Sequence, residues 1–159
     1  DIRVCAETAQ FGLQEPKWGL FPLGGSTVYS MTYFGLWIIS THILQVRMPQ
    51  QVPYAIAMEI LLTGKLIGAD LALRHGFVNY VVPKDQVLDK ALEIASIIAE
   101  NGPFAVRAIK ASVKGCLGLP ERVALEKEYE YGQPVFAHPD AIEGPMAFLQ
   151  KRKPNWSKL

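Results

Sequence analysis

The sequence predicts an α/β fold with few, short strands and many helices. Residues 2–6 are β-prone, and residues 77–82 are rich in β-branched and aromatic side chains, which favour a strand. Elsewhere, apolar residues recur at the spacing of amphipathic helices. The chain has 159 residues, of which 50% are hydrophobic. This length suits one domain with a core, or a piece of one, and is too short to favour two.

The first helix is expected from Tyr54 to Thr63, after a break predicted at Met48 to Pro53. Its apolar residues recur at helical spacing, and Gly64 supplies a C-terminal stop. A shorter helix is expected from Ala69 to His75, ending at Gly76. The strand at 77–82 follows and is closed by a proline.

The second half of the chain predicts four helices. A long one begins near Asp85 with an apolar face, and the next begins after Gly102. In that next helix, Ala105, Ile109 and Val113 are predicted to line the buried side. A further helix starts near Glu121 and is predicted to end at Pro134; the last opens at Pro139 and Asp140. The predicted apolar face of the long helix comprises Leu88, Ala91, Leu92, Ala95, Ile98 and Ala99.

Charge and cysteine content exclude several classes of function. The formal net charge is +1, and no block of like charges indicates a nucleic-acid partner. Cys5 and Cys116 lie far apart without metal-like spacing, so we expect neither a disulfide framework nor a zinc site, and a reducing compartment fits best. The three histidines also lack the spacing of metal ligands, and we expect no metal.

One long segment carries no charge. Residues 18–46 contain no Asp, Glu, Lys or Arg, and the inner part, Tyr29 to Val46, approaches the length of a membrane span. Its polar side chains make it poorer than an ordinary transmembrane helix, so we favour no membrane anchor, with anchoring as the alternative. These polar residues are Ser30, Thr32, Ser40, Thr41, His42 and Gln45.

The loop around Glu15 is the strongest candidate for chemistry. Glu15 precedes Pro16, which fixes its own φ, and glycines including Gly24 and Gly25 permit backbone conformations closed to other residues. If a helix starts near Ser26, its N-terminal N–H groups would favour a phosphate or an oxyanion. On these residues alone a plain turn is favoured, and a catalytic loop is the alternative.

Four stretches, taken in order, resemble the enoyl-CoA hydratase/isomerase (crotonase) family. They are residues 1–22, 62–83, 101–110 and 136–152. The resemblance implies that the chain corresponds to the second half of a complete member. Residues 1–80 would then be the C-terminal part of a core of repeated ββα turns, and residues 81–159 a helical region that forms trimers. We interpret residues 29–46 as an insertion, compatible with translated non-coding sequence or a mispredicted splice.

The resemblance also implies a reaction and a site. Members bind acyl-CoA thioesters and hold the thioester oxygen with two backbone N–H groups. Hydratases add water across the C2=C3 double bond with two glutamates, and Glu15 matches the second. Phe148 and Lys151 would contact the adenine and phosphate end of a neighbouring subunit's CoA, and Gly24 and Gly25 would help to bind substrate. CoA belongs to the substrate, so no separate cofactor is expected.

The same comparison sets limits and leaves alternatives. In the family, the first glutamate and the oxyanion donors lie in a segment before the position of Asp1, so we expect a fragment that is incomplete on its own. Gln14 stands where proline commonly precedes the glutamate. The alternatives are an enoyl-CoA isomerase and a catalytically inactive subunit that acts only in oligomer interaction. A complete protein would be a homotrimer or hexamer, cytoplasmic or in an organelle matrix such as the mitochondrial one.

Overall fold

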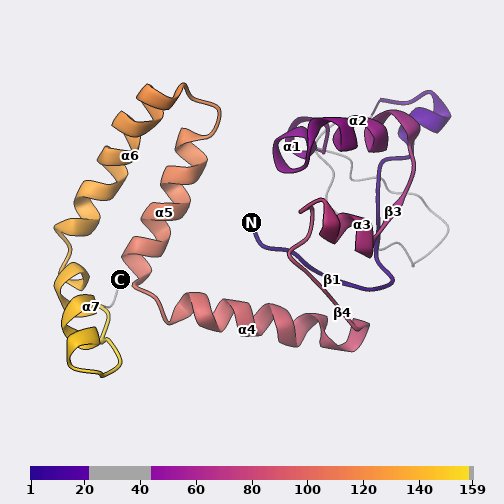
Figure 1. The fold of residues 1–159 in the computed structure, drawn as a ribbon. Coiled ribbons are helices and arrows are strands. Elements are labelled where there is room, and N and C mark those ends of the chain that lie inside the picture. Colours follow the sequence, from indigo (N-terminus) through magenta and orange to yellow (C-terminus); the bar gives the residue numbers. More distant parts are fainter. Residues whose placement is uncertain (22–43, 158–159) are drawn as a thin grey trace. The chain divides into compact units, whose positions relative to one another are not determined.

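The computed structural model describes residues 1–21 and 44–157 (Figure 1). They form two compact units, divided between Leu92 and Glu93. The resemblance places the boundary between the core and the helical region between residues 80 and 81. That boundary refers to the architecture of a complete family member and stays a prediction. Gly24, Gly25 and most of the segment interpreted as an insertion lie outside the described residues.

Two short sheets belong to the first unit. Strand β1 (Val4–Ala6) pairs in parallel with β4 (Tyr80–Val82), and β2 (Gln10–Phe11) pairs antiparallel with β3 (Ile67–Gly68). Both predicted strand regions are therefore present, and the first half of 77–82 is not strand. Phe77 there donates its N–H to the end of a helix and is buried, which removes it from the β ladder.

The first unit also contains three helices: α1 (Leu44–Gln51), α2 (Tyr54–Thr63) and α3 (Ala69–Arg74). Helix α2 has the predicted bounds, and Gly64 ends it in the left-handed region with φ 61°. The break predicted to start at Met48 is wrong, because α1 continues through Pro49. Met48 in that helix is 1% exposed, and its burial stabilises a turn that proline alone disfavours.

The core of the first unit collects buried side chains from β1, β2 and the three helices, and Ile67 of β3 and Val81 of β4 pack against it. Phe11 and Phe77 meet edge to face with ring centroids 5.4 Å apart, a geometry that aromatic pairs prefer. The buried cluster contains Cys5, Phe11, Leu13, Met48, Val52, Ala57, Ile60, Ala69, Ala72, Phe77 and Val78. The core therefore joins the N-terminal strand to the loop that carries Glu15.

Helix α4 (Val87–Ala99) follows a short 3-10 turn, Lys84–Gln86. Its start lies two residues after the predicted Asp85, which falls in that turn. The predicted apolar face is largely exposed: Leu88 is 67% exposed and Leu92 is 54% exposed. No described residue covers this face enough to bury any side chain of α4.

The second unit is helical. Helices α5 (Pro103–Cys116) and α6 (Glu121–Phe136) run antiparallel and side by side, and α7 (Asp140–Leu149) follows (Figure 1). A Cβ on Gly115 would lie 2.5 Å from the Tyr131 hydroxyl, so glycine in α5 leaves room for the Tyr131 ring of α6.

Two predictions for this unit are wrong. Helix α6 does not end at Pro134 but continues to Phe136, since proline there loses one backbone hydrogen bond without stopping the last turn. The predicted buried side of α5 is exposed at Ile109 (63%) and Val113 (61%). Periodicity identified an apolar face correctly, but within the described residues no element covers it.

None of the helices in residues 1–21 and 44–157 combines the length and the apolar character that crossing a membrane requires. The candidate anchor from Tyr29 to Val46 lies mostly outside these residues.

Candidate active site

Glu15 begins a 3-10 turn, Glu15–Trp18, in the first unit. Pro16 is the next residue and suits the first positions of such a turn, because its φ is already fixed. The carbonyl of Glu15 accepts the N–H of Leu20 at 3.0 Å, and Gly19 closes the turn at φ 67°. Backbone hydrogen bonds therefore hold the residue that carries the carboxylate.

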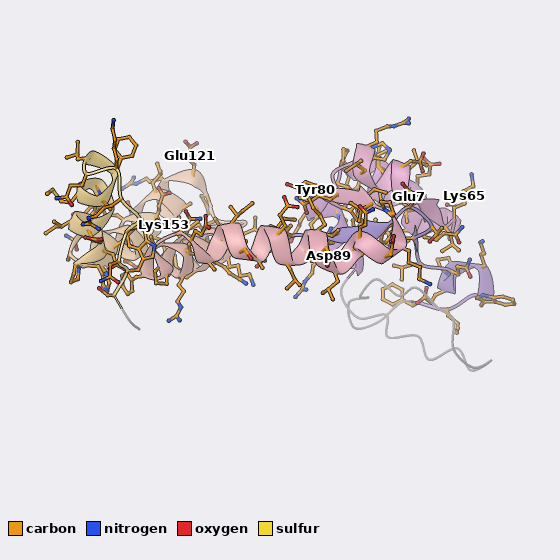
Figure 2. All side chains as sticks on the ribbon, turned by 90° about the horizontal axis from the view of Figure 1, so that it is seen from below. Glu7, Lys65, Tyr80, Asp89, Glu121 and Lys153 are labelled. Atoms are coloured by element: carbon orange, nitrogen blue, oxygen red, sulfur yellow. The ribbon has the colours of Figure 1, made fainter. Side chains whose placement is uncertain are left out.

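The loop before Glu15 is packed closely against the segment that joins α2 to β3. A Cβ on Gly12 would lie 2.5 Å from the carbonyl oxygen of Lys65, a residue labelled in Figure 2. A Cβ on Gly64 would lie 3.2 Å from the carbonyl oxygen of Leu13. Glycine at both positions lets the segment before Glu15 and the segment after α2 touch along their backbones.

The Glu15 side chain is buried, with 5% of the residue exposed. No described residue forms a hydrogen bond with its Oε1 atom. A buried carboxylate oxygen without a partner costs free energy, so such groups in folded proteins call for an explanation. A site that receives a proton-exchanging ligand supplies one, because the oxygen must then remain available to that ligand.

Arg3 is held in the first unit by several contacts that no local sequence pattern indicated. Its guanidinium donates to the Phe77 carbonyl oxygen and to Gln51 Oε1, and it lies 4.5 Å from the centroid of the Phe77 ring. The Arg3 N–H donates to Asn79 Oδ1 at 2.9 Å, and the Asn79 N–H donates back to the Arg3 carbonyl at 2.9 Å. Burial lowers the pKa of Arg3 below its ordinary value.

Arg3 lies against one ring of an aromatic pair in the core. It covers Phe77, and Phe77 contacts Phe11, which lies four residues before Glu15. A charged residue inside the β-prone start of the chain was the available sequence signal, but nothing local indicated that its partners lie more than forty residues away.

Phe148 and Lys151 lie in the second unit, where the end of α7 brings them together. The Lys151 N–H donates to the Phe148 carbonyl oxygen at 3.1 Å. The Phe148 side chain is 83% exposed, and Lys151 is also exposed. Both side chains are thus accessible in this structure, as contacts with a ligand require.

Lys151 also has an unusual backbone. Its φ is 52°, in the left-handed region, which costs a residue other than glycine roughly 1 kcal/mol. The Arg152 N–H donates to the Ala147 carbonyl at 3.0 Å, so the turn is a Schellman motif with Lys151 at the position where glycine is usual. The remaining candidates, Gly24 and Gly25, lie outside the described residues.

The sequence matches the family model of Enoyl-CoA hydratase/isomerase over residues 26–158. The chain belongs to this family. Phe148 and Lys151 fall inside the matched range and Glu15 before it, while the curated relatives align with 98% of the chain.

Individual members of the family are similar to nearly the whole chain. Enoyl-CoA hydratase EchA19 of Mycobacterium tuberculosis is 42% identical over 98% of this chain and 52% of its own length. Carnitinyl-CoA dehydratase of Escherichia coli is 34% identical over 98% of this chain and 54% of its own length. The chain therefore spans about half the length of the curated relatives it matches.

Solved structures agree with this assignment. The crystal structure of enoyl-CoA hydratase EchA1 from Mycobacterium marinum matches with a TM-score of 0.83 and 33% identity, over 98% of this chain and 55% of that one. An enoyl-CoA hydratase of M. tuberculosis matches with a TM-score of 0.83 and 32% identity, over 99% and 55%. The predicted resemblance is confirmed, and the chain has a crotonase-like α/β fold that is mostly helical.

Proposed function

We propose that Glu15 is a general acid/base of an enoyl-CoA hydratase-type site, where water adds across the C2=C3 double bond of an acyl-CoA thioester. The buried carboxylate of Glu15, whose Oε1 has no partner among the described residues, is the observation that supports this proposal. A group that exchanges a proton with water needs an oxygen that the protein itself does not occupy. Backbone hydrogen bonds within the turn restrain the residue that carries this oxygen.

In the proposed reaction, Glu15 accepts a proton from the water molecule whose oxygen bonds to C3. The electron pair of the double bond moves toward the thioester oxygen, where hydrogen-bond donors stabilise the enolate. Glu15 then gives the proton it took from water to C2, which regenerates the carboxylate, so the product carries the hydroxyl on C3 and the added hydrogen on C2. The reverse sequence dehydrates a 3-hydroxyacyl thioester.

We propose that this chain provides part of the site within a longer protein. Its match to about half of each relative supports this, and so does the presence of one buried carboxylate, Glu15, among the described residues. In this proposal another segment supplies the second carboxylate and the oxyanion donors. The complete protein forms homotrimers or hexamers and acts in the cytoplasm, or in an organelle matrix.

We propose further that Phe148 and Lys151 contact the CoA part of the substrate. Phe148 presents an exposed ring on which an adenine can stack, and Lys151 presents an ammonium that can meet phosphate. Gly24 and Gly25 remain candidates for binding the acyl thioester. No cofactor beyond the CoA of the substrate enters the proposal.

The natural protein that carries this sequence tests the role of Glu15. Steady-state hydration of a short 2-enoyl-CoA is measured for Glu15→Gln, and we expect turnover to fall by about 10²- to 10⁴-fold. Glu7→Gln is the matched control, because Glu7 lies in the same unit and is exposed (Figure 2). Undiminished turnover in Glu15→Gln would remove Glu15 from catalysis.

Isomerisation of a 3-enoyl-CoA to the 2-enoyl form is the second candidate. It uses the same oxyanion stabilisation and can proceed with one carboxylate that moves a proton between C4 and C2. Glu15, the buried carboxylate among the described residues, is sufficient for this reaction. Assays with both substrates separate the two reactions, and activity with neither would favour an inactive subunit that acts only in oligomer interaction.

A further inference from the structure

The turn after α7 carries a left-handed lysine. Among the described residues, Lys151 is the one non-glycine residue with a positive φ. Helix α3 ends in the same arrangement, with Gly76 at φ 71° in place of lysine. The Gly76 N–H donates to the Leu73 carbonyl oxygen, and the Phe77 N–H donates to the Ala72 carbonyl oxygen. Glycine therefore occupies the left-handed position of this motif after α3, whereas lysine occupies it after α7. Glycine would adopt that backbone conformation with less strain than Lys151.

The Arg152 side chain brackets Lys151 on both sides. Its Nε donates to Gln150 Oε1 at 2.7 Å, and its Nη1 donates to the Lys153 carbonyl oxygen at 3.2 Å. Gln150 precedes Lys151 and Lys153 follows it, so one planar guanidinium connects the two ends of the turn. Arg152 thereby restrains the backbone from which the Lys151 side chain projects.

Glu143 fixes the guanidinium in turn. Arg152 Nη1 and Nη2 donate to Glu143 Oε1 and Oε2 at 2.5 and 2.9 Å, a two-pronged pair that allows little rotation. Glu143 Oε1 also accepts the Asn155 N–H at 2.6 Å. These bonds, first those from Arg152, lower the pKa of Glu143 to about 2, so the carboxylate is ionised throughout the neutral range.

The segment beyond the turn is anchored separately. The Trp156 indole N–H donates to the Glu100 carbonyl at 2.8 Å, and Ser157 donates from N–H and hydroxyl to Asp140 Oδ1 at 2.9 and 2.8 Å. A Cβ on Gly144 would lie 3.2 Å from the Trp156 ring. Because the chain is held at both ends of the turn, its geometry is determined before any ligand arrives.

We propose that Glu143 and Arg152 are positioning residues that hold the Lys151 ammonium ready for a phosphate group of CoA. The inference rests on the proposed contact between Lys151 and CoA and extends it to residues that do not touch the ligand. A preorganised lysine loses less side-chain and backbone freedom on binding, which increases affinity without adding a contact. Left-handed backbone that the surroundings impose is typical of ligand sites.

Titration calorimetry on the natural protein, with free CoA as the probe, tests this inference. Lys151→Met removes the ammonium, and we expect the Kd for CoA to rise about 10-fold or more, as for a charge-assisted hydrogen bond. Glu143→Gln releases the guanidinium but leaves Lys151 in place, and we expect a rise of about 3-fold. Glu126→Gln is the matched control, since it weakens an exposed Arg122–Glu126 pair on α6.

The double variant distinguishes positioning from a general structural effect. If Glu143 acts through Lys151, adding Glu143→Gln to Lys151→Met leaves the Kd of the single Lys151→Met variant unchanged. An equal effect of Glu143→Gln in both backgrounds would overturn the inference, and so would an unchanged Kd in Glu143→Gln alone. An unchanged Kd in Lys151→Met would overturn the proposed CoA contact itself, which is a different result.

Discussion

Gly12 and Lys65 approach so closely that a Cβ on Gly12 would lie 2.5 Å from the Lys65 carbonyl oxygen. The contact lies beside the pairing of β2 with β3, and the Glu15 turn begins three residues after Gly12. Both partners are backbone, so neither can rotate out of the way as a side chain could.

Gly12→Ala should therefore destabilise the protein and move the Glu15 turn. We expect the free energy of unfolding to fall by about 1–3 kcal/mol, as for an overpacked core site. Urea denaturation measures it. Gly132→Ala is the control, because Gly132 lies in α6 with nothing within 4 Å of its Cβ position, and alanine there should stabilise by about 0.5–1 kcal/mol. Equal effects of the two substitutions would contradict this account.

Arg3→Lys should destabilise the first unit despite keeping the charge. Lysine cannot donate to the Phe77 carbonyl and to Gln51 while covering the Phe77 ring, so we expect a loss of about 2 kcal/mol. Urea denaturation measures this loss, and we expect the dependence of the free energy of unfolding on urea concentration to stay the same. Gln51→Ala removes one of these partners and should cost less, whereas a fully stable Arg3→Lys would show that the guanidinium fork is dispensable.

Lys151→Gly should leave the stability of the protein unchanged or raise it. Glycine relieves the left-handed backbone at φ 52°, so we expect the free energy of unfolding to stay equal or rise by up to about 1 kcal/mol. Gly76→Ala is the reciprocal change in the same motif of α3, where a Cβ meets nothing within 4 Å, and it should cost about 1 kcal/mol. Thermal unfolding of both variants checks the opposite signs.

The C-terminal segment should lose stability in acid. Hydrogen bonds from Arg152 lower the pKa of Glu143 from 4.5 to about 2, and hydrogen bonds from Ser157 lower the pKa of Asp140 below 3.8. Because the folded-state pKa is lower than the unfolded one, the stabilisation is present above about pH 4.5 and is lost as the pH falls toward 2. The NMR signal of the Trp156 indole N–H follows this loss, and Glu143→Gln should remove part of the pH dependence.

The sequence predicted local features well where one residue type determines the backbone. Helix α2 has its predicted bounds because its apolar spacing and its C-terminal cap, Gly64, are both local features of the sequence. The turn at Gly76 was also predicted, and in the structure this glycine has a φ of 71°. By contrast, α1 was missed because Pro49 indicated a break, while the burial of Met48 that favours a helix depends on distant parts of the chain.

The candidate site divides in the same way. The family resemblance indicated Glu15, Phe148 and Lys151, but no local pattern indicated that Glu15 is buried with an oxygen lacking a partner among the described residues. The role of Arg3 and the pair between Glu143 and Arg152 also depend on contacts across sequence distance. Periodicity shows that a face is apolar, and only the fold shows whether anything covers it.

The exposed apolar faces of the helical unit affect how it responds to denaturant. Ile109 and Val113 are more than half exposed in the folded state, and within the described part of this unit Ala147 is the one buried hydrophobic residue. Unfolding it then brings little new apolar surface into contact with water. The heat-capacity increment and the urea slope of its unfolding should be small for its length, and its unfolding transition should be broad. A surface that covers these apolar faces should make the transition sharper.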